Sequence, residues 1–363
     1  MKYPTLFVRA LFVLALLSAR GNPQRLSQEQ KGLAAKLDAQ AVAQVAKGFS
    51  GSVLVVNSGK LILNKDYGLP ESSGETAFWI GSNTKQFAAA AILKLQEQGK
   101  LALTDPITKF FEKVPADKRS ITVRQLLCHM SGLPHMYVTD GITDRQAAAK
   151  AILDLPLKTK PGTEYSYSND GYVLLAIIIE IASGKKYEDY LRESILRPAG
   201  MTHTGFWGEP VKVPFAPIPQ KLNTRPNRFV DGRTIANWGD RGSTGLYSTT
   251  GDQYKWLTAL LSGKILSPLS TGQMWGAHAF VRHGTKPGQE VYYGYGWAVV
   301  MQDGKRYAVN HAGDEDWLSH NAVISYYEGN NNAYIILSNA GEPNGRSWSS
   351  LMGENLRALV PGQ

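Results

Sequence analysis

The chain has 363 residues, which is enough for one large domain or two of ordinary size. Hydrophobic residues make up 43% of the chain and charged residues 19%, a globular composition that excludes a disordered protein. The formal net charge is +9 but no dense run of lysine and arginine occurs, so we expect no nucleic-acid partner. Cys128 is the only cysteine, so we expect no internal disulfide.

Residues 1–21 have the pattern of a secretory signal peptide. Lys2 and Arg9 supply positive charge, and residues 10–19 form an apolar stretch that is too short to span a bilayer. An uncleaved membrane anchor is the alternative interpretation. We expect cleavage, which would place the mature domain, residues 22–363, in the periplasm or outside the cell with no membrane span.

Two apolar runs near the N-terminus predict a β-hairpin. Residues 51–56 and 61–65 are separated by residues 57–60, which have the composition of a turn. The preceding residues 22–47 become amphipathic, with apolar side chains near helical spacing. Residues 69–76 are loop-like and lead to the segment discussed next.

Residues 78–87 hold a Ser-x-x-Lys pair, Ser82 and Lys85, at the start of a helix that we expect to end at Gly99. Positions three apart share a helix face, so the Ser82 hydroxyl would lie beside the Lys85 amine. The partial positive charge of a helix N-terminus favours an oxyanion and disfavours a protonated lysine. A neutral Lys85 would accept the Ser82 proton and make the serine a nucleophile. The alternative is a capping serine with a solvated lysine one turn further on.

The middle of the chain is predicted to be mostly helical. A polar turn, residues 128–134, follows a short helix, and a second polar segment, residues 165–169, precedes a very apolar helix over residues 172–182. Further helices are expected over residues 87–98, 121–127, 144–154, 187–196 and 254–261, with long loops over residues 205–242.

Apolar stretches near the C-terminus predict three strands and a closing helix: residues 306–310, 322–327, 333–338 and 347–359. Strands therefore lie at both ends of the chain, with helices between them. The economical packing is an α+β fold with one five-stranded antiparallel sheet flanked by helices, the terminal helix covering one face. We expect a sheet lobe from about residues 30–80 and 290–363, and an inserted, mostly helical lobe from about residues 81–285.

Three short motifs occur in order along the chain: Ser82-x-x-Lys85, Tyr167-Ser168-Asn169 and His311-Ala312-Gly313. With them the chain resembles the serine hydrolases related to class C β-lactamases and penicillin-binding proteins, the β-lactamase-related superfamily. In that superfamily the third motif is Lys-Thr-Gly in β-lactamases and often His-x-Gly in esterase-like members. Connecting segments at residues 126–134, 161–163 and 295–297 match as well, and the resemblance runs from about residue 51 to residue 339. It implies the β-lactamase/transpeptidase-like fold.

The resemblance implies a role for each motif residue. Ser82 is the expected nucleophile, and Lys85 and Tyr167 are the candidate bases, sharing one proton network. A nearby cation such as Lys85 would lower the pKa of the Tyr167 phenol. The alternative for Tyr167 is a buried core position. Asn169 would orient Lys85 or a substrate amide, and it is equally suited to cap the helix that follows.

The third motif is expected on the strand beside the cleft. There His311 would donate a hydrogen bond to Tyr167 or to the substrate, although a histidine after a strand is often structural. The family pattern places the oxyanion hole at the backbone N–H groups of Ser82 and Asp314, next to Gly313.

The sequence departs from the family pattern directly after the third motif. Relatives usually continue with glycine and small residues, whereas this chain has Asp314, Glu315 and Asp316. A substrate carboxylate beside these acids would be repelled, so we expect a neutral or amine-bearing ester or amide and poor hydrolysis of β-lactams. The aromatic side chains between Tyr292 and Trp297 would line an acyl pocket or the edge of the core.

The sequence therefore predicts an exported serine hydrolase that acts through an acyl-enzyme on a small-molecule or peptide substrate, as an esterase or D-aminopeptidase-like enzyme. The alternatives are a β-lactamase or D-Ala-D-Ala carboxypeptidase, and a non-catalytic binding protein on the same fold. The chain contains no Gly-x-Ser-x-Gly and no His-Glu-x-x-His, which argues against an α/β-hydrolase and a metallohydrolase. We expect no cofactor and no metal, and the sequence favours no particular oligomeric state.

Overall fold

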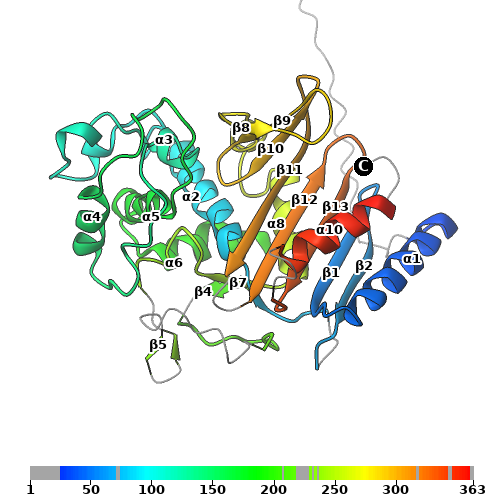
Figure 1. Cartoon of the computed structure of the whole chain (residues 1–363). Helices are drawn as coiled ribbons and strands as arrows, with labels where there is room; N and C mark the ends of the chain where they lie inside the picture. The colour runs from blue at the N-terminus through cyan, green and yellow to red at the C-terminus, as the bar shows by residue number, and fades with distance from the viewer. Residues whose placement is uncertain are drawn as a thin grey trace, which may run out of the picture.

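Figure 1 shows the fold in a computed structural model of the chain. The structure describes residues 25–70, 74–206, 208–217, 229–230, 233–234, 237–315, 319–341 and 346–359. The predicted signal peptide lies outside these residues. No helix among the described residues has both the length and the apolar character needed to cross a membrane.

The main sheet has eight antiparallel strands in the order β2-β1-β13-β12-β11-β10-β9-β8. They are β1 (Gly51–Asn57), β2 (Lys60–Tyr67), β8 (Ala279–His283), β9 (Gln289–Tyr293), β10 (Ala298–Gln302), β11 (Lys305–Glu315), β12 (His320–Tyr327) and β13 (Asn332–Ser338). The prediction of a five-stranded sheet is therefore wrong by three strands. β8, β9 and β10 have five residues each, are only partly buried and are separated by glycine-containing turns, so their patterns give a weaker strand signal than those of the other strands.

The predicted N-terminal hairpin is confirmed by β1 and β2, which pair antiparallel. Ser58 and Gly59 form its turn with φ of 49° and 76°, the left-handed conformation that a tight two-residue hairpin turn requires. β1 also pairs with β13, and Gly51 lies opposite Ser338. The N-terminal and C-terminal strands thus belong to one sheet, as predicted.

Two terminal helices, α1 (Gln28–Val45) and α10 (Trp348–Leu359), cover one face of the sheet (Figure 1). Leu37 and Ala41 of α1 and Met352 and Leu356 of α10 are buried in one hydrophobic cluster with side chains of that face. The predicted closing helix is confirmed. A capping box at Ser27 fixes the start of α1.

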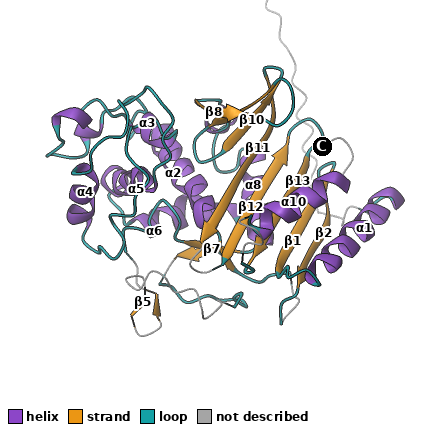
Figure 2. Cartoon of the chain, in the orientation of Figure 1, coloured by secondary structure: helices purple, strands orange, loops and turns teal. Residues whose placement is uncertain are grey.

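The opposite face of the sheet packs against α2 (Lys85–Glu97), α8 (Thr250–Leu261) and α9 (Pro268–Met274), within the largest hydrophobic cluster. Further helices lie beside the sheet (Figure 2): α3 (Val123–Leu127), α4 (Arg145–Leu153), α5 (Asn169–Ser183) and α6 (Tyr187–Leu191). The short helix α7 (Arg197–Ala199) follows α6 in the chain. Short 3-10 or π turns occupy Gly81–Thr84, Ile107–Lys109, Ala116–Lys118 and Arg192–Leu196.

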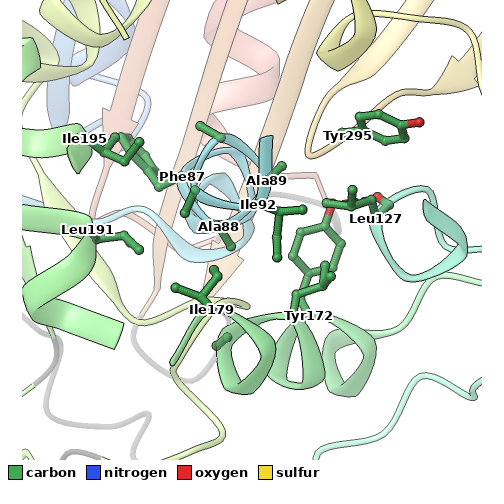
Figure 3. Close-up of a cluster of buried hydrophobic side chains, with 14 of the residues drawn as sticks. Phe87, Ala88, Ala89, Ile92, Leu127, Tyr172, Ile179, Leu191, Ile195 and Tyr295 are labelled. Carbon is green, nitrogen blue, oxygen red and sulfur yellow. Dashed lines mark hydrogen bonds between the residues drawn. The ribbon is translucent and has the colours of Figure 1, made fainter. Parts of the chain in front are cut away.

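α2 is the central helix of the molecule, and Figure 3 shows it in end view among side chains from several elements. Ala88 and Ala89 are completely buried, and their small side chains let the neighbouring helices approach closely. Ile179 of α5 and Ile195 pack around this helix (Figure 3). Because its core contacts surround it, α2 holds its N-terminal end in a fixed position.

Residues 205–242 were expected to be loops, but their described part also contains short strands. β4 (Gly205–Phe206) and β3 (Phe78–Trp79) both pair with β7 (Leu246–Ser248). β5 (Phe229–Val230) and β6 (Arg233–Thr234) form a two-stranded hairpin. β3 matters for the site, because it ends just before Ser82.

Candidate active site

Ser82 lies in the 3-10 turn Gly81–Thr84, directly before α2 begins at Lys85. Lys85 Nζ donates a hydrogen bond to Ser82 Oγ at 3.0 Å. It also donates to Asn169 Oδ1 at 2.7 Å and to the backbone oxygen of Ser243 at 3.0 Å. These three acceptors match the three N–H groups of an ammonium. Lys85 is completely buried, so the alternative of a solvated lysine is wrong.

Tyr167 meets the same serine from the segment before α5. Its hydroxyl donates to Ser82 Oγ at 2.8 Å, and Lys85 Nζ lies 4.9 Å from the centre of its ring. Burial raises the pKa of Tyr167 above its ordinary value, and the hydrogen bond with Ser82 opposes this only in part. The expectation that Lys85 lowers this pKa is therefore wrong. Tyr167 is a neutral phenol that donates a hydrogen bond to Ser82 Oγ.

Asn169 is the first residue of α5, and Ser168 is its cap, with Ser168 Oγ accepting from the N–H of Gly171 at 3.1 Å. The alternative that Asn169 itself caps the helix is wrong. The Asn169 side chain instead spans two groups, since Oδ1 accepts from Lys85 and Nδ2 lies 3.2 Å from His135 Nε2. An amide nitrogen only donates, so Nδ2 is the donor and His135 Nε2 the acceptor. Asn169 thus orients Lys85, as expected.

His311 is buried in β11, and its hydrogen-bond partners differ from those expected. Nδ1 lies 2.6 Å from the backbone oxygen of Ala312, and Nε2 lies 2.9 Å from the hydroxyl of Tyr293. A carbonyl only accepts, so Nδ1 carries the proton and Nε2 accepts from Tyr293. Burial, with the Lys85 charge as a second cause, lowers the pKa of His311 to about 3. His311 is therefore a neutral imidazole that bonds Tyr293 in place of Tyr167.

The turn that holds Ser82 touches the end of β11 through two glycines. A Cβ on Gly313 would lie 2.0 Å from the backbone oxygen of Ile80 and 2.9 Å from the backbone nitrogen of Ser82. A Cβ on Gly81, whose φ is +50°, would lie 2.9 Å from the backbone nitrogen of Asp314. Only glycine fits at either position. This close approach brings the N–H groups of Ser82 and Asp314, the expected oxyanion hole, into the same small region.

A cavity of about 620 Å³ opens onto these groups. Five predicted residues line it: Ser82, Tyr167, Asn169, His311 and Asp314. Lys85 and Gly313 are not among its lining residues; Lys85 lies behind Ser82 and Gly313 beside it. Tyr293 lines the cavity whereas Trp297 is completely buried in the core, so the aromatic segment serves both of the purposes considered for it.

Several residues that line the cavity were not predicted from the sequence, notably His135, Tyr165 and Arg282. His135 follows the matched segment 126–134 by one residue, so extending that match would have found it. Arg282 lies in β8, a strand that was not predicted, and no sequence signal marks it. Among the described residues, no cluster of histidine, cysteine, aspartate and glutamate is suited to hold a metal.

His129 does not line the cavity, but it contacts the segment that carries Tyr167. It is buried in the left-handed conformation, with φ of 57°, and its Nδ1 accepts from the backbone N–H of Ser168 at 3.1 Å. Its ring lies 4.2 Å from the ring of Tyr167, measured between centres. Burial lowers the pKa of His129 well below its ordinary value, so a neutral imidazole fixes the Tyr167 segment.

The family model described as Beta-lactamase matches residues 37–351. The chain belongs to this family. The protein PbpX of Bacillus subtilis (strain 168), whose name describes a penicillin-binding protein, is 32% identical over 262 residues. The match covers 70% of this chain and 63% of PbpX, so the chain spans less than two thirds of that relative's length.

Solved structures are similar to this beta-lactamase-family chain over nearly all of its length. The octameric penicillin-binding protein homologue from Pyrococcus abyssi has a TM-score of 0.75 and 27% identity, and the match covers 91% of this chain and 77% of that one. The D-amino acid amidase from Ochrobactrum anthropi SV3, complexed with D-phenylalanine, has a TM-score of 0.71 and 25% identity, with 92% and 100% covered. The predicted β-lactamase/transpeptidase-like fold is confirmed.

Proposed function

We propose that this protein is a serine hydrolase that cleaves an ester or amide through an acyl-enzyme on Ser82. The observation that carries the proposal is the convergence of two side chains on one hydroxyl. Ser82 Oγ lies 3.0 Å from Lys85 Nζ and 2.8 Å from the Tyr167 hydroxyl. A serine with a base and an acid in hydrogen-bond contact has what acyl transfer requires.

Lys85 is the proposed base and Tyr167 the proposed acid. Lys85 must first lose one proton; its neutral amine then takes the Ser82 proton while Oγ attacks the carbonyl carbon of the substrate. Tyr167 gives its hydroxyl proton to the departing alcohol or amine and regains one from Lys85. The raised pKa of Tyr167 keeps the phenol protonated, and a general acid must hold its proton until the leaving group departs.

The negative oxygen that forms on the substrate carbonyl is proposed to bind the N–H groups of Ser82 and Asp314, beside Gly313. Such preorganised donors stabilise the tetrahedral intermediate more than the substrate. A water molecule then attacks the acyl-enzyme along the same proton route, which releases the acid product and restores Ser82.

For the substrate we propose a neutral or amine-bearing acyl group near the scissile bond. The Asp314 side chain lines the cavity beside Ser82 and would repel a carboxylate there. The similarity to a D-amino acid amidase supports an amide or ester of this kind. A β-lactamase or D-Ala-D-Ala carboxypeptidase is the second candidate, and the name of PbpX favours it. Export to the periplasm or beyond is proposed from the pattern of residues 1–21.

A panel of aryl esters, D-aminoacyl anilides and a chromogenic cephalosporin, tested on the wild type and on Ser82→Ala, distinguishes these candidates. We expect faster hydrolysis of the esters or anilides than of the cephalosporin, and a loss of at least about a thousandfold in Ser82→Ala. Faster turnover of the cephalosporin would favour the second candidate. If neither a fluorophosphonate nor penicillin forms an adduct on Ser82, the protein is a non-catalytic binding protein.

A further inference from the structure

An exposed arginine, Arg282, lines the cavity from β8, at the far edge of the sheet. The pairing of β8 with β9 shifts between Phe280 and Arg282, which leaves Val281 as an extra residue and puts Arg282 opposite Val291. Such a β-bulge changes which side chains face each side of a strand. In a regular strand, Val281 would take the place opposite Val291 and Arg282 would face the other way. The bulge therefore turns Arg282 toward the face on which Val291 and Tyr293 line the cavity.

Arg282 has hydrogen-bond donors left for a ligand. Its Nη1 donates to the backbone oxygen of His283 at 3.2 Å, and it forms no ion pair with a carboxylate of the described residues. The only acid in the β8–β9 hairpin is Glu290, which lies opposite His283 and accepts from the hydroxyl of Tyr292 at 2.9 Å. Successive residues of a strand face opposite sides, so Glu290 points away from the cavity face.

The strand register separates Arg282 from the reacting centre. Arg282 lies opposite Val291, and this row continues through Val300 to Ala308 of β11. The backbone of Ser82 adjoins Gly313, five residues further along β11. With a rise of ~3.3 Å per residue and a spacing of ~4.8 Å between neighbouring strands, the backbones of Arg282 and Gly313 are about 20 Å apart. An anion attached directly beside the scissile carbonyl cannot reach Arg282.

The two ends of the cavity therefore differ in charge, with the Asp314 carboxylate beside Ser82 and the Arg282 guanidinium at the far end. We propose that Arg282 is a specificity-determining residue that binds an oxyanion, such as a carboxylate or phosphate, at the remote end of an extended substrate. The guanidinium forms paired hydrogen bonds with such groups. This inference rests on the proposed function and adds to it that the substrate is neutral or cationic near the scissile bond and anionic several bonds away.

The kinetic test uses p-nitrophenyl monoesters of α,ω-dicarboxylic acids of increasing chain length, each paired with its methyl-capped diester. A parallel series ends in phosphonate. For the wild type we expect kcat/KM to favour the anionic ester of each pair, by about three- to tenfold, once the chain is long enough to reach Arg282. Arg282→Gln should remove this preference, so that each anionic ester and its capped partner give the same kcat/KM, and Arg282→Glu should reverse it. The series with the larger ratio of kcat/KM between anionic and capped esters, carboxylate or phosphonate, identifies the oxyanion that Arg282 binds.

Lys286→Gln is the matched control, because Lys286 lies in the same hairpin and carries the same charge but does not line the cavity. It should keep the preference. Equal rates for anionic and capped esters at every length, or a preference that survives in Arg282→Gln, would overturn the proposal. Arg282 would then serve only as a charge that protects an edge strand from pairing with another chain.

A binding measurement separates this inference from the proposed function. Ser82→Ala is titrated calorimetrically with the amide analogues of the same acids, carboxylate-ended and capped, with and without Arg282→Gln. Tighter binding of the carboxylate-ended amide that depends on Arg282 supports the remote site even if the wild type hydrolyses nothing. Hydrolysis without any effect of Arg282 in either measurement supports the proposed function and rejects the remote site.

Discussion

Asn169 holds Lys85 by a hydrogen bond of 2.7 Å between Oδ1 and Nζ, and both side chains are buried. The amide is a neutral acceptor, so it orients the lysine without adding a charge that would stabilise the ammonium. Because the proposed mechanism needs a neutral amine, this neutrality is a functional property of the site. The importance of a neutral side chain at this position can be tested with Asn169→Asp, which replaces the amide nitrogen by an oxygen.

Asn169→Asp should lower kcat by about a hundredfold and move the pH optimum upward. The new carboxylate sits beside Nζ and favours its charged form, so Lys85 gives up its proton only at higher pH. The pH profiles of kcat for the two proteins provide the measurement. Asn169→Leu is the control, because it removes the hydrogen bond without adding charge and should lower kcat without an upward shift. Identical profiles for Asn169→Asp and the wild type would contradict Lys85 as the base.

Gly313→Ala should damage both stability and catalysis. The added Cβ would lie 2.0 Å from the backbone oxygen of Ile80, and separating β11 from the Ser82 turn costs about 1–3 kcal/mol in the free energy of unfolding. The displaced N–H groups should reduce kcat by about 10²–10³-fold. Urea denaturation measures the free energy of unfolding, and steady-state kinetics measures kcat. Gly272→Ala in α9 is the control, since its Cβ meets nothing within 4 Å. It should leave kcat unchanged and raise the free energy of unfolding by about 0.5–1 kcal/mol, the usual gain of alanine over glycine inside a helix.

The buried histidines should make the protein less stable in mild acid. Burial lowers the pKa of His311 to about 3 and that of His320 to about 4, from an ordinary value of 6.5. Below pH 6.5 these two imidazoles become protonated in the unfolded chain but stay neutral in the folded protein. The free energy of unfolding therefore falls as the pH drops toward their lowered pKa values. Above pH 6.5 this contribution is complete and constant.

Thermal unfolding across neutral and mildly acidic pH measures this dependence. His311→Asn should lower the slope of the melting temperature against pH without abolishing it, because His320 still titrates in the same direction. His283→Asn is the control, since His283 is exposed on the β8–β9 hairpin, and its slope should equal that of the wild type. An unchanged slope in His311→Asn would show that this imidazole is not held neutral by the fold.

Asp170 should produce the opposite dependence. It follows Asn169 in α5 and is buried, and burial raises its pKa from 3.8 to about 7, with Asp140 contributing in the same direction. Between these two values the folded protein keeps a proton that the unfolded chain loses, so the contribution of Asp170 declines as the pH rises through this interval. Above pH 7 it is constant and unfavourable.

Asp170→Asn removes this carboxyl group, so the variant should gain stability relative to the wild type as the pH rises from mildly acidic values to about 7. The difference between the two melting curves at each pH isolates the contribution of Asp170 from that of the histidines. Asp154→Asn, at an exposed position after α4, should give a difference that does not vary in this way. A constant difference for Asp170→Asn as well would mean that the folded state leaves Asp170 ionised.

The elements that were predicted correctly are those whose apolar residues follow a regular strand or helix pattern without interruption. β1, β2, β12 and β13 and the helix α5 are nearly all buried or bounded by clear turn residues, so their patterns are unambiguous. β8, β9 and β10 are short and half-exposed. β10 pairs with β11, β9 with β10 and β8 with β9, and this pairing decides their conformation more than their own side chains do. Predicting five strands instead of eight follows from this difference.

The site shows the same division between local and tertiary information. The Ser82–Lys85 contact follows from helical spacing alone, and the contacts of Tyr167 and Asn169 agree with what their motif implies. The expected bond between His311 and Tyr167 was wrong because Tyr293 takes that place from β9, a strand that the sequence did not reveal. The direction of the Tyr167 pKa was wrong because charge is visible in a sequence and burial is not.

The order of strands in the sheet also determines when during biosynthesis the candidate site can form. Ser338 Oγ donates to the backbone oxygen of Ser50, 288 positions earlier, and β13 and β12 stand between β1 and β11 in the sheet. Contacts between such distant segments close slowly and late in folding. A nascent polypeptide that still lacks β12 and β13 has no sheet to join β11 to β1. We therefore expect it to acquire the proposed hydrolytic activity only after synthesis is almost finished.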